Sequence, residues 1–201
     1  MFLLFVLSCA PALARSLPAP VLVLGDSLSA AYGIRPESGW VHLLHARLQE
    51  QVPAREVVNA SISGETTAGG LARLGKLLTA HQPALVILEL GANDALRGLP
   101  LSVPRENLTR LIAMSRESGA RVLLVGIEIP VNYGPQYRDG LRTMYRDLAA
   151  EFNVPLVPFL LEGVALDPAL MQEDGLHPTA AAQPRVLENI WPALEKMIPA
   201  H

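Results

Sequence analysis

Five short runs of nearly continuous apolar residues are spaced along the chain. They are residues 21–25, 56–60, 85–90, 121–127 and 155–159. A strand with one solvated face alternates apolar and polar residues, whereas a strand buried on both faces is apolar throughout. We therefore expect these runs to be central strands of one parallel sheet.

Segments of helical period separate the five runs. Their apolar residues recur at intervals of three and four, as in Trp40, Leu43, Leu44 and Leu48, in Leu71, Leu74, Leu77 and Leu78, and in Leu108, Leu111 and Ile112. Such spacing gives each helix one apolar stripe. Because strand and helix alternate five times, the pattern predicts a three-layer α/β/α fold with right-handed crossovers. Pro184 is expected to kink or delay the last helix, since proline lacks an N–H and crowds the preceding turn.

The length and charge of the chain narrow its class. With 201 residues, half of them hydrophobic, the chain fills one domain, and no repeat or linker divides residues 15–201. A net charge of -3 leaves no large basic surface, so a nucleic-acid partner is disfavoured. A fold of this kind needs no partner to complete its core, and a monomer is expected.

Residues 1–14 are typical of a signal peptide. Residues 2–7 form an apolar run, and Ala12, Leu13 and Ala14 supply a small-residue cleavage site. The run is shorter than the roughly 20 apolar residues that span a bilayer, so no stable membrane span is expected. We expect export to the periplasm or the exterior, with lipidation of Cys9 as the less favoured alternative. Cys9 is the only cysteine, so cleavage after Ala14 leaves no disulfide and no thiolate nucleophile.

The first run ends in the sequence Gly25-Asp26-Ser27-Leu28-Ser29. In open parallel sheets ligands bind beyond the carboxyl ends of the strands, so Ser27 stands where a nucleophile would be exposed. The alternative is that Ser27 caps a following helix, as serine often does. The elbow GxSxG is absent, which argues against the α/β-hydrolase fold.

Asp174, Gly175, Leu176, His177 and Pro178 precede the last helical segment. A carboxylate three residues before a histidine can fold back to the imidazole, fix its tautomer and stabilise its charged form. The alternative is that Asp174 and His177 only cap the helix.

Two loops after the second and third runs could stabilise negative charge. Residues 59–64 end in Gly64, and residues 91–94 read Gly-Ala-Asn-Asp. Glycine lets a backbone N–H approach a ligand closely, and the side-chain amide of Asn93 is a neutral donor. Ordinary turn chemistry, in which Gly, Asn and Asp are common, explains the same residues.

In this order, the four blocks resemble those of the SGNH, or GDSL, hydrolases. From about Val21 to Gln183 the sequence is similar to the bacterial periplasmic thioesterases, arylesterases and lysophospholipases of that superfamily. The resemblance implies a flavodoxin-like SGNH hydrolase fold with a central five-stranded parallel sheet. It also implies that Ser27 is the nucleophile, that His177 is its base and that Asp174 orients the base.

The resemblance further implies an oxyanion hole and an acyl site. The oxyanion hole would consist of the backbone N–H groups of Ser27 and Gly64 and the side chain of Asn93. The acyl site would be lined by the loop after the fourth strand, with Ile129, Pro130 and Tyr133 as substrate-binding residues. The alternative is that Ile129 only covers the sheet edge.

No cofactor and no metal is expected. His42 and His45 lie three residues apart on a predicted helix, but no third ligand is close to them in sequence. His81 and His201 are interpreted as structural or incidental.

Three functions are compatible with these residues. The first is a serine esterase, thioesterase or lysophospholipase that cleaves esters and thioesters of fatty acyl groups through an acyl-enzyme. The second is a carbohydrate acetyl esterase that uses the same triad and prefers acetate to octanoate. The third is a flavodoxin-like binding module that holds phosphate at the first turn, although such a turn is normally richer in Ser, Thr and Gly.

Overall fold

The computed structural model describes residues 18–52 and 55–198, and it contains the predicted parallel sheet of five strands. The strands are β1 (Val21–Gly25), β2 (Val57–Asn59), β3 (Leu85–Glu89), β4 (Arg121–Val125) and β5 (Leu156–Val157). Every neighbouring pair is parallel, in the order β2-β1-β3-β4-β5. The predicted signal peptide, Cys9 and His201 lie outside the described residues.

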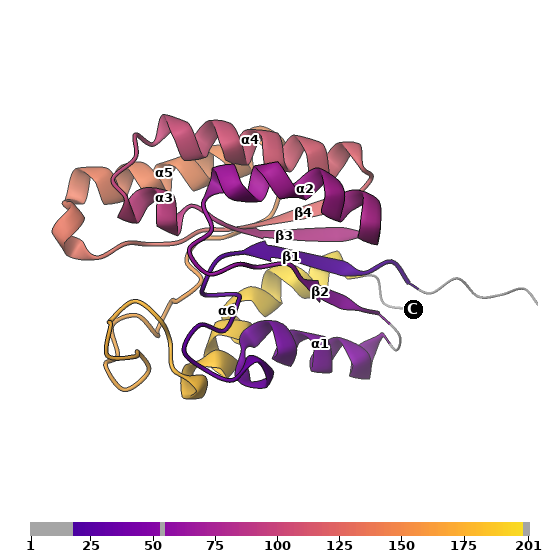
Figure 1. The fold of residues 1–201 in the computed structure, drawn as a ribbon, viewed down its shortest axis with the longest axis horizontal. Helices are drawn as coiled ribbons and strands as arrows, with labels where there is room; N and C mark the ends of the chain where they lie inside the picture. The colour runs from indigo at the N-terminus through magenta and orange to yellow at the C-terminus, as the bar shows by residue number, and fades with distance from the viewer. Residues whose placement is uncertain (1–17, 53–54, 199–201) are drawn as a thin grey trace, which may run out of the picture.

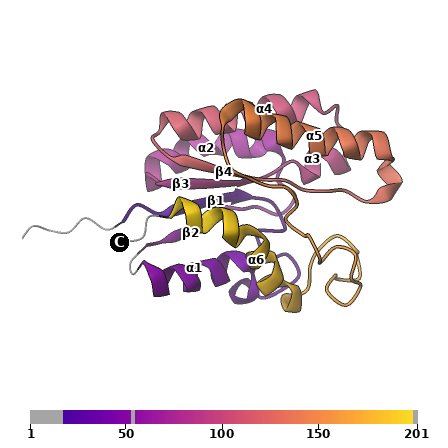
Figure 2. The same cartoon turned by 180° about the vertical axis from the view of Figure 1, so that it is seen from behind.

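Helices cover both faces of the sheet, which confirms the three predicted layers (Figures 1 and 2). On one face lie α1 (Trp40–Gln51) and α6 (Gln183–Leu194). On the other lie α2 (Thr67–His81), α3 (Ala92–Leu96), α4 (Ser102–Glu117) and α5 (Pro135–Phe152). Four 3-10 turns complete the elements: η1 (Pro36–Ser38), η2 (Val131–Tyr133), η3 (Ala180–Ala182) and η4 (Glu195–Met197). Over the described ranges, no helix combines the length and the apolarity that crossing a bilayer requires.

The continuous apolar strands serve two separate cores. In β1, Val21 and Val23 pack into the cluster under α1 and α6, whereas Leu22 and Leu24 pack into the cluster under α2, α4 and α5. All five residues of β1 are buried. Successive side chains point to opposite faces of a strand, so a strand covered on both sides needs apolar residues at every position.

The observed strands are shorter than the apolar runs. The fifth run spans residues 155–159, but only Leu156 and Val157 form β5. Pro155 and Pro158 flank them, and proline has no N–H to donate to a sheet. The second run likewise yields only three paired residues, at the opposite edge of the sheet.

Two helix-related expectations meet the structure here. Turns, not a helix, follow β1, and α1 starts only at Trp40, so Ser27 does not cap a helix. Pro184 lies in the first turn of α6, which starts at Gln183, and it is tolerated there because the first N–H groups of a helix have no intrahelical partner to lose.

The direction in which successive strands are added to the sheet reverses between β1 and β3. The chain passes from β1 outward to β2 and then crosses back to β3 on the other side of β1. Ligands bind at such a switch point, beyond the carboxyl ends of the strands. The segments that follow β1, β2 and β3, and the long loop between β5 and α6, meet at this edge (Figure 1).

Candidate active site

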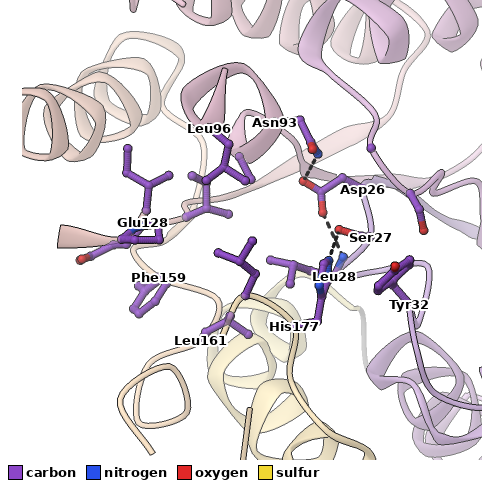
Figure 3. A pocket seen from close by; sticks show the side chains of 17 residues that line it. Asp26, Ser27, Leu28, Tyr32, Asn93, Leu96, Glu128, Phe159, Leu161 and His177 are labelled. Atoms are coloured by element: carbon purple, nitrogen blue, oxygen red, sulfur yellow. Dashed lines mark hydrogen bonds between the residues drawn. The ribbon is translucent and has the colours of Figure 1, made fainter. Parts of the chain in front are cut away.

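Ser27, His177 and Asp174 form a continuous hydrogen-bonded row at this edge, of which Figure 3 shows Ser27 and His177. The distance from Ser27 Oγ to His177 Nε2 is 2.8 Å, and the distance from His177 Nδ1 to Asp174 Oδ2 is 2.6 Å. Ser27 and His177 are 150 residues apart in sequence. The fold therefore brings the first and last motifs within proton-transfer reach.

The loop that carries Asp174 is fixed by its own hydrogen bonds. Asp174 Oδ1 accepts from the N–H groups of Leu176 and His177, at 2.9 and 3.0 Å. Partial burial raises the pKa of Asp174, but the hydrogen bonds from the His177 ring and from these two N–H groups outweigh it and lower the pKa to about 2. Asp174 is thus ionised at neutral pH and can stabilise a positively charged imidazole. Neither residue caps a helix, because η3 starts after Thr179 and α6 after Ala182.

Two backbone donors near Ser27 are free to bind a ligand. In the part of the chain that the structure describes, the N–H groups of Ser27 and Gly64 donate no hydrogen bond. Gly64 has φ +79, a conformation that favours glycine. Arg97 donates to the Gly64 carbonyl at 3.2 Å, which helps to orient this peptide.

Asn93 lines the same cavity, but its amide is already engaged. Asn93 Nδ2 donates to Asp26 Oδ2 at 3.1 Å and to the Glu65 carbonyl at 3.0 Å. Any bond from this amide to an oxyanion has to be shared with one of these acceptors. Gly91, which positions the turn into α3, has φ +124, and a Cβ there would lie 2.3 Å from the Tyr145 hydroxyl.

Asp26 is a buried acid directly before Ser27, and the sequence reasoning gave it no role. It is 1% exposed, and its Oδ1 accepts from the Leu28 N–H at 3.0 Å. Burial raises the pKa of Asp26 to about 6, although the hydrogen bonds from Leu28 and Asn93 and the charge of His177 lower it. Only its position beside the nucleophile could have marked it in the sequence.

A cavity of about 240 Å³ extends from Ser27 and His177 into the protein. Ile129 and Pro130 line it, as the resemblance implies. Tyr133 does not line it: its hydroxyl donates to the Leu96 carbonyl at 2.7 Å, behind the wall that Leu96 forms.

Side chains that the sequence analysis did not single out form the rest of the cavity wall. They are Leu28, Tyr32, Ser63, Ala92, Leu96, Ile127, Glu128, Phe159, Leu161 and Leu176. Most lie in loops after strands, and no spacing rule connects them. Only the shared position beyond the strand ends could have indicated them.

Glu128 and Phe159 lie at the end of the cavity away from Ser27 (Figure 3). Both also line a second hollow of about 390 Å³, so they separate the two spaces. Glu128 is held in place by Arg142, with contacts of 2.8 and 2.6 Å, and by Arg138 at 3.1 Å. The hydrogen bonds from Arg142 lower the pKa of Glu128, despite its partial burial. This end of the cavity wall therefore carries a carboxylate that is paired with two arginines.

Tyr32 lies on the opposite side of Ser27 and His177 from Phe159 (Figure 3). Its ring centroid is 4.4 Å from that of His177, and the rings are tilted by 39°. Gln172 Nε2 donates to the Tyr32 carbonyl at 2.9 Å, and Gln172 N–H donates to the His177 carbonyl at 2.7 Å. Gln172 thus connects the segment that follows Ser27 with the histidine loop.

His42 and His45 are remote from this site. His45 Nδ1 accepts from the Val57 N–H at 3.3 Å, a contact between α1 and β2. Within residues 18–52 and 55–198, no cluster of three or more His, Cys, Asp and Glu could hold a metal ion.

The chain is similar to known proteins over most of its length. Residues 23–184 match the model of the GDSL-like Lipase/Acylhydrolase family. The chain is 51% identical over 178 residues to Esterase TesA from Pseudomonas aeruginosa, which covers 89% of each protein. It is 42% identical to Thioesterase 1/protease 1/lysophospholipase L1 from Escherichia coli K12, over 89% of this chain and 84% of the relative.

A solved structure is also similar. The psychrotrophic esterase EstA from Pseudoalteromonas sp., described as inhibited by monoethylphosphonate, superposes with a TM-score of 0.84 at 40% identity. The match covers 89% of this chain and 97% of EstA. The chain therefore belongs to the GDSL-like lipase/acylhydrolase family, and its activity is that of a serine acyl hydrolase.

Proposed function

We propose that the protein hydrolyses carboxylic esters and thioesters of fatty acyl groups through an acyl-enzyme on Ser27. The observation that carries the proposal is the row of contacts of 2.8 and 2.6 Å from Ser27 through His177 to Asp174. A nucleophile, a base and a carboxylate in this order are the arrangement that activates a serine hydroxyl.

In the proposed reaction, His177 Nε2 takes the Ser27 proton as Oγ attacks the acyl carbonyl carbon. Asp174 keeps the proton of Nδ1 in place and stabilises the charged ring. The N–H groups of Ser27 and Gly64, with the Asn93 amide, donate to the oxyanion. His177 then protonates the leaving oxygen or sulfur, and a water molecule activated by the same ring releases the acid.

The cavity supports a substrate with an acyl chain. Beyond the reacting carbonyl it offers apolar walls from Leu96, Ile127, Ile129 and Leu161. Burying such a chain is favourable by about 0.8 kcal/mol per methylene group. An acetyl group would leave most of this apolar space empty, and the family match gives no support to a phosphate-binding module.

Covalent labelling tests the nucleophile. Because EstA is described as inhibited by a phosphonate, we expect a fluorophosphonate probe to label wild-type protein at Ser27. Ser27→Ala should lose both labelling and turnover, while its unfolding transition stays close to that of wild type. Labelling of a folded Ser27→Ala protein, or no labelling of wild type, would contradict the proposal.

A substrate panel tests the acyl class. We suggest aryl esters, acyl-CoA thioesters and lysophospholipids, with Ser27→Ala as the blank. The proposal requires octanoyl substrates to be turned over at least as well as acetyl ones. A strong preference for acetate would favour the carbohydrate acetyl esterase.

Export is part of the same proposal. If residues 1–14 are a signal peptide, then the mature chain begins at Arg15. Intact mass measurement of protein from a periplasmic fraction tests this start. A lipid-modified chain that begins at Cys9 would indicate the alternative processing.

A further inference from the structure

Glu89 is a buried acid that the proposed reaction leaves without a role. It is the last residue of β3, it is 0% exposed, and it pairs with Gly25 of β1. Its Oε2 accepts from the Asp26 N–H at 3.2 Å and from the Ser29 hydroxyl at 2.7 Å, and among the described residues its Oε1 has no hydrogen-bond partner. Burying an unpaired carboxylate is costly, so this arrangement favours a carboxyl group without charge.

The groups around Glu89 are acidic or neutral. Burial, and then the charge of Asp26, raise the pKa of Glu89 well above its usual value, although two of the hydrogen bonds that it accepts lower it. The buried phenol of Tyr145 and the carboxylate of Asp94 also face this pair. The positive charge that acts on this pair is that of His177, and it acts on Asp26. Within the described residues, Glu89 thus has no cation partner.

The two hydrogen bonds of Glu89 hold residues on both sides of the nucleophile. Asp26 and Ser29 lie on either side of Ser27, and both are held by one carboxyl oxygen. Gly25 makes this possible: a Cβ there would lie 2.7 Å from Glu89 Oε2 and 2.7 Å from Ser29 Oγ. Any side chain at Gly25 would therefore displace the Glu89 carboxyl group from the turn that carries Ser27.

Through Asp26, Glu89 also affects Asn93, the side-chain donor of the oxyanion site. Glu89 holds the backbone of Asp26, and the carboxylate of Asp26 accepts from Asn93 Nδ2 at 3.1 Å. A charge on Glu89 would place a second negative group behind the position where the oxyanion develops. Like charges in a buried site oppose one another strongly, and the oxyanion would be destabilised.

We propose that Glu89 is a positioning residue, whose uncharged carboxyl group fixes the nucleophile turn and limits the buried negative charge beside the oxyanion site to that of Asp26. The inference rests on the proposed role of Ser27.

Two substitutions at Glu89 test it by steady-state kinetics with p-nitrophenyl butyrate. Glu89→Gln keeps an uncharged group of the same shape, whose carbonyl oxygen can accept both bonds, so kcat should stay within about threefold of wild type. Glu89→Ala removes both hydrogen bonds to the nucleophile turn. The value of kcat should then fall about 10- to 100-fold with little change in KM, because misplacing an oxyanion donor has a milder effect than removing it. Equal losses in the two variants would overturn the proposal.

Infrared spectroscopy measures the protonation state of Glu89 directly. The infrared difference spectrum of wild type minus Glu89→Gln at pH 7 should contain the C=O stretch of a protonated carboxylic acid. The acidic limb of the kcat/KM profile should be the same in both proteins. A carboxylate band in the difference spectrum, or a shifted limb in Glu89→Gln, would show that Glu89 is charged and would refute the inference.

Ser29→Ala keeps the test decisive if Glu89→Ala does not fold. It removes one of the two bonds to Glu89, and Ser115→Ala is the matched control, because it removes a buried hydroxyl that donates to the Leu111 carbonyl far from the site. Only Ser29→Ala should lower kcat. If Ser27→Ala remained active, then the proposed function would fail; if Ser27→Ala were inactive but Ser29→Ala and Glu89→Ala matched wild type, then only the role of Glu89 would fail.

Discussion

Replacing Asp26 with asparagine should remove a pH-dependent part of the protein's stability while it impairs catalysis. Asp26 is 1% exposed, and burial raises its pKa from the usual 3.8 to about 6. At about 1.4 kcal/mol per pKa unit, ionising this group costs the folded state about 3 kcal/mol. Asp26→Asn removes that cost because an amide does not titrate.

The sign of the pH dependence of stability follows from the direction in which the pKa of Asp26 is shifted. The folded protein binds the Asp26 proton more tightly than the unfolded chain does. The associated stability is therefore fully present below pH 3.8 and is lost as the pH rises through about 6. Between pH 5 and pH 8 about 1.4 kcal/mol of it should disappear in wild type, and Asp26→Asn should lose none of it.

Urea unfolding of wild type and Asp26→Asn at pH 5 and pH 8 measures this difference. Asp147→Asn is the matched control, because it removes one carboxylate from the exposed face of α5. The activity of Asp26→Asn should fall at least about tenfold, since its amide can no longer accept the Asn93 hydrogen bond while it serves Leu28. If the stability difference between wild type and Asp26→Asn were the same at both pH values, then the reasoning from burial would be refuted.

Three further outcomes follow from the cavity and the triad. Phe159→Ala should join the two hollows and shift the preferred p-nitrophenyl ester toward longer acyl chains, whereas an unchanged chain-length profile would show that Phe159 and Glu128 do not limit the acyl site. Asp174→Asn should lower kcat at least about 100-fold with little change in the thermal midpoint, because it disturbs the imidazole tautomer at a partly exposed position; near-normal turnover would contradict the role of Asp174. Tyr32→Ala should lower kcat severalfold while Tyr32→Phe retains it, because the aromatic ring, and not the hydroxyl, lies against His177; equal activities of the two variants would rule this out.

The sequence was sufficient to predict the five strands, several of the helices and the motifs. Strands such as β1 and β3 are readable because each lies buried between two helical layers, which demands apolar residues at every position. The motifs around Ser27 and His177 are readable because short spacing and position after a strand limit what their side chains can do. The local pattern did not predict where the strands end. Pro155 and Pro158 limit β5 to two residues, because proline has no N–H to donate to the neighbouring strand.

Only the tertiary structure decided how the site is built. The contact of Glu89 with Asp26 joins residues 63 apart, and it depends on the register that sets Gly25 opposite Glu89. The cavity wall of Phe159 and Glu128, and the ring contact between Tyr32 and His177, likewise join segments that share no pattern. Sequence periodicity records which face of an element is buried, but the identity of the neighbour across that face comes from the packing of the whole chain. Burial and the charge of neighbours then determine the pKa of each acid, so protonation in this site is a property of the fold.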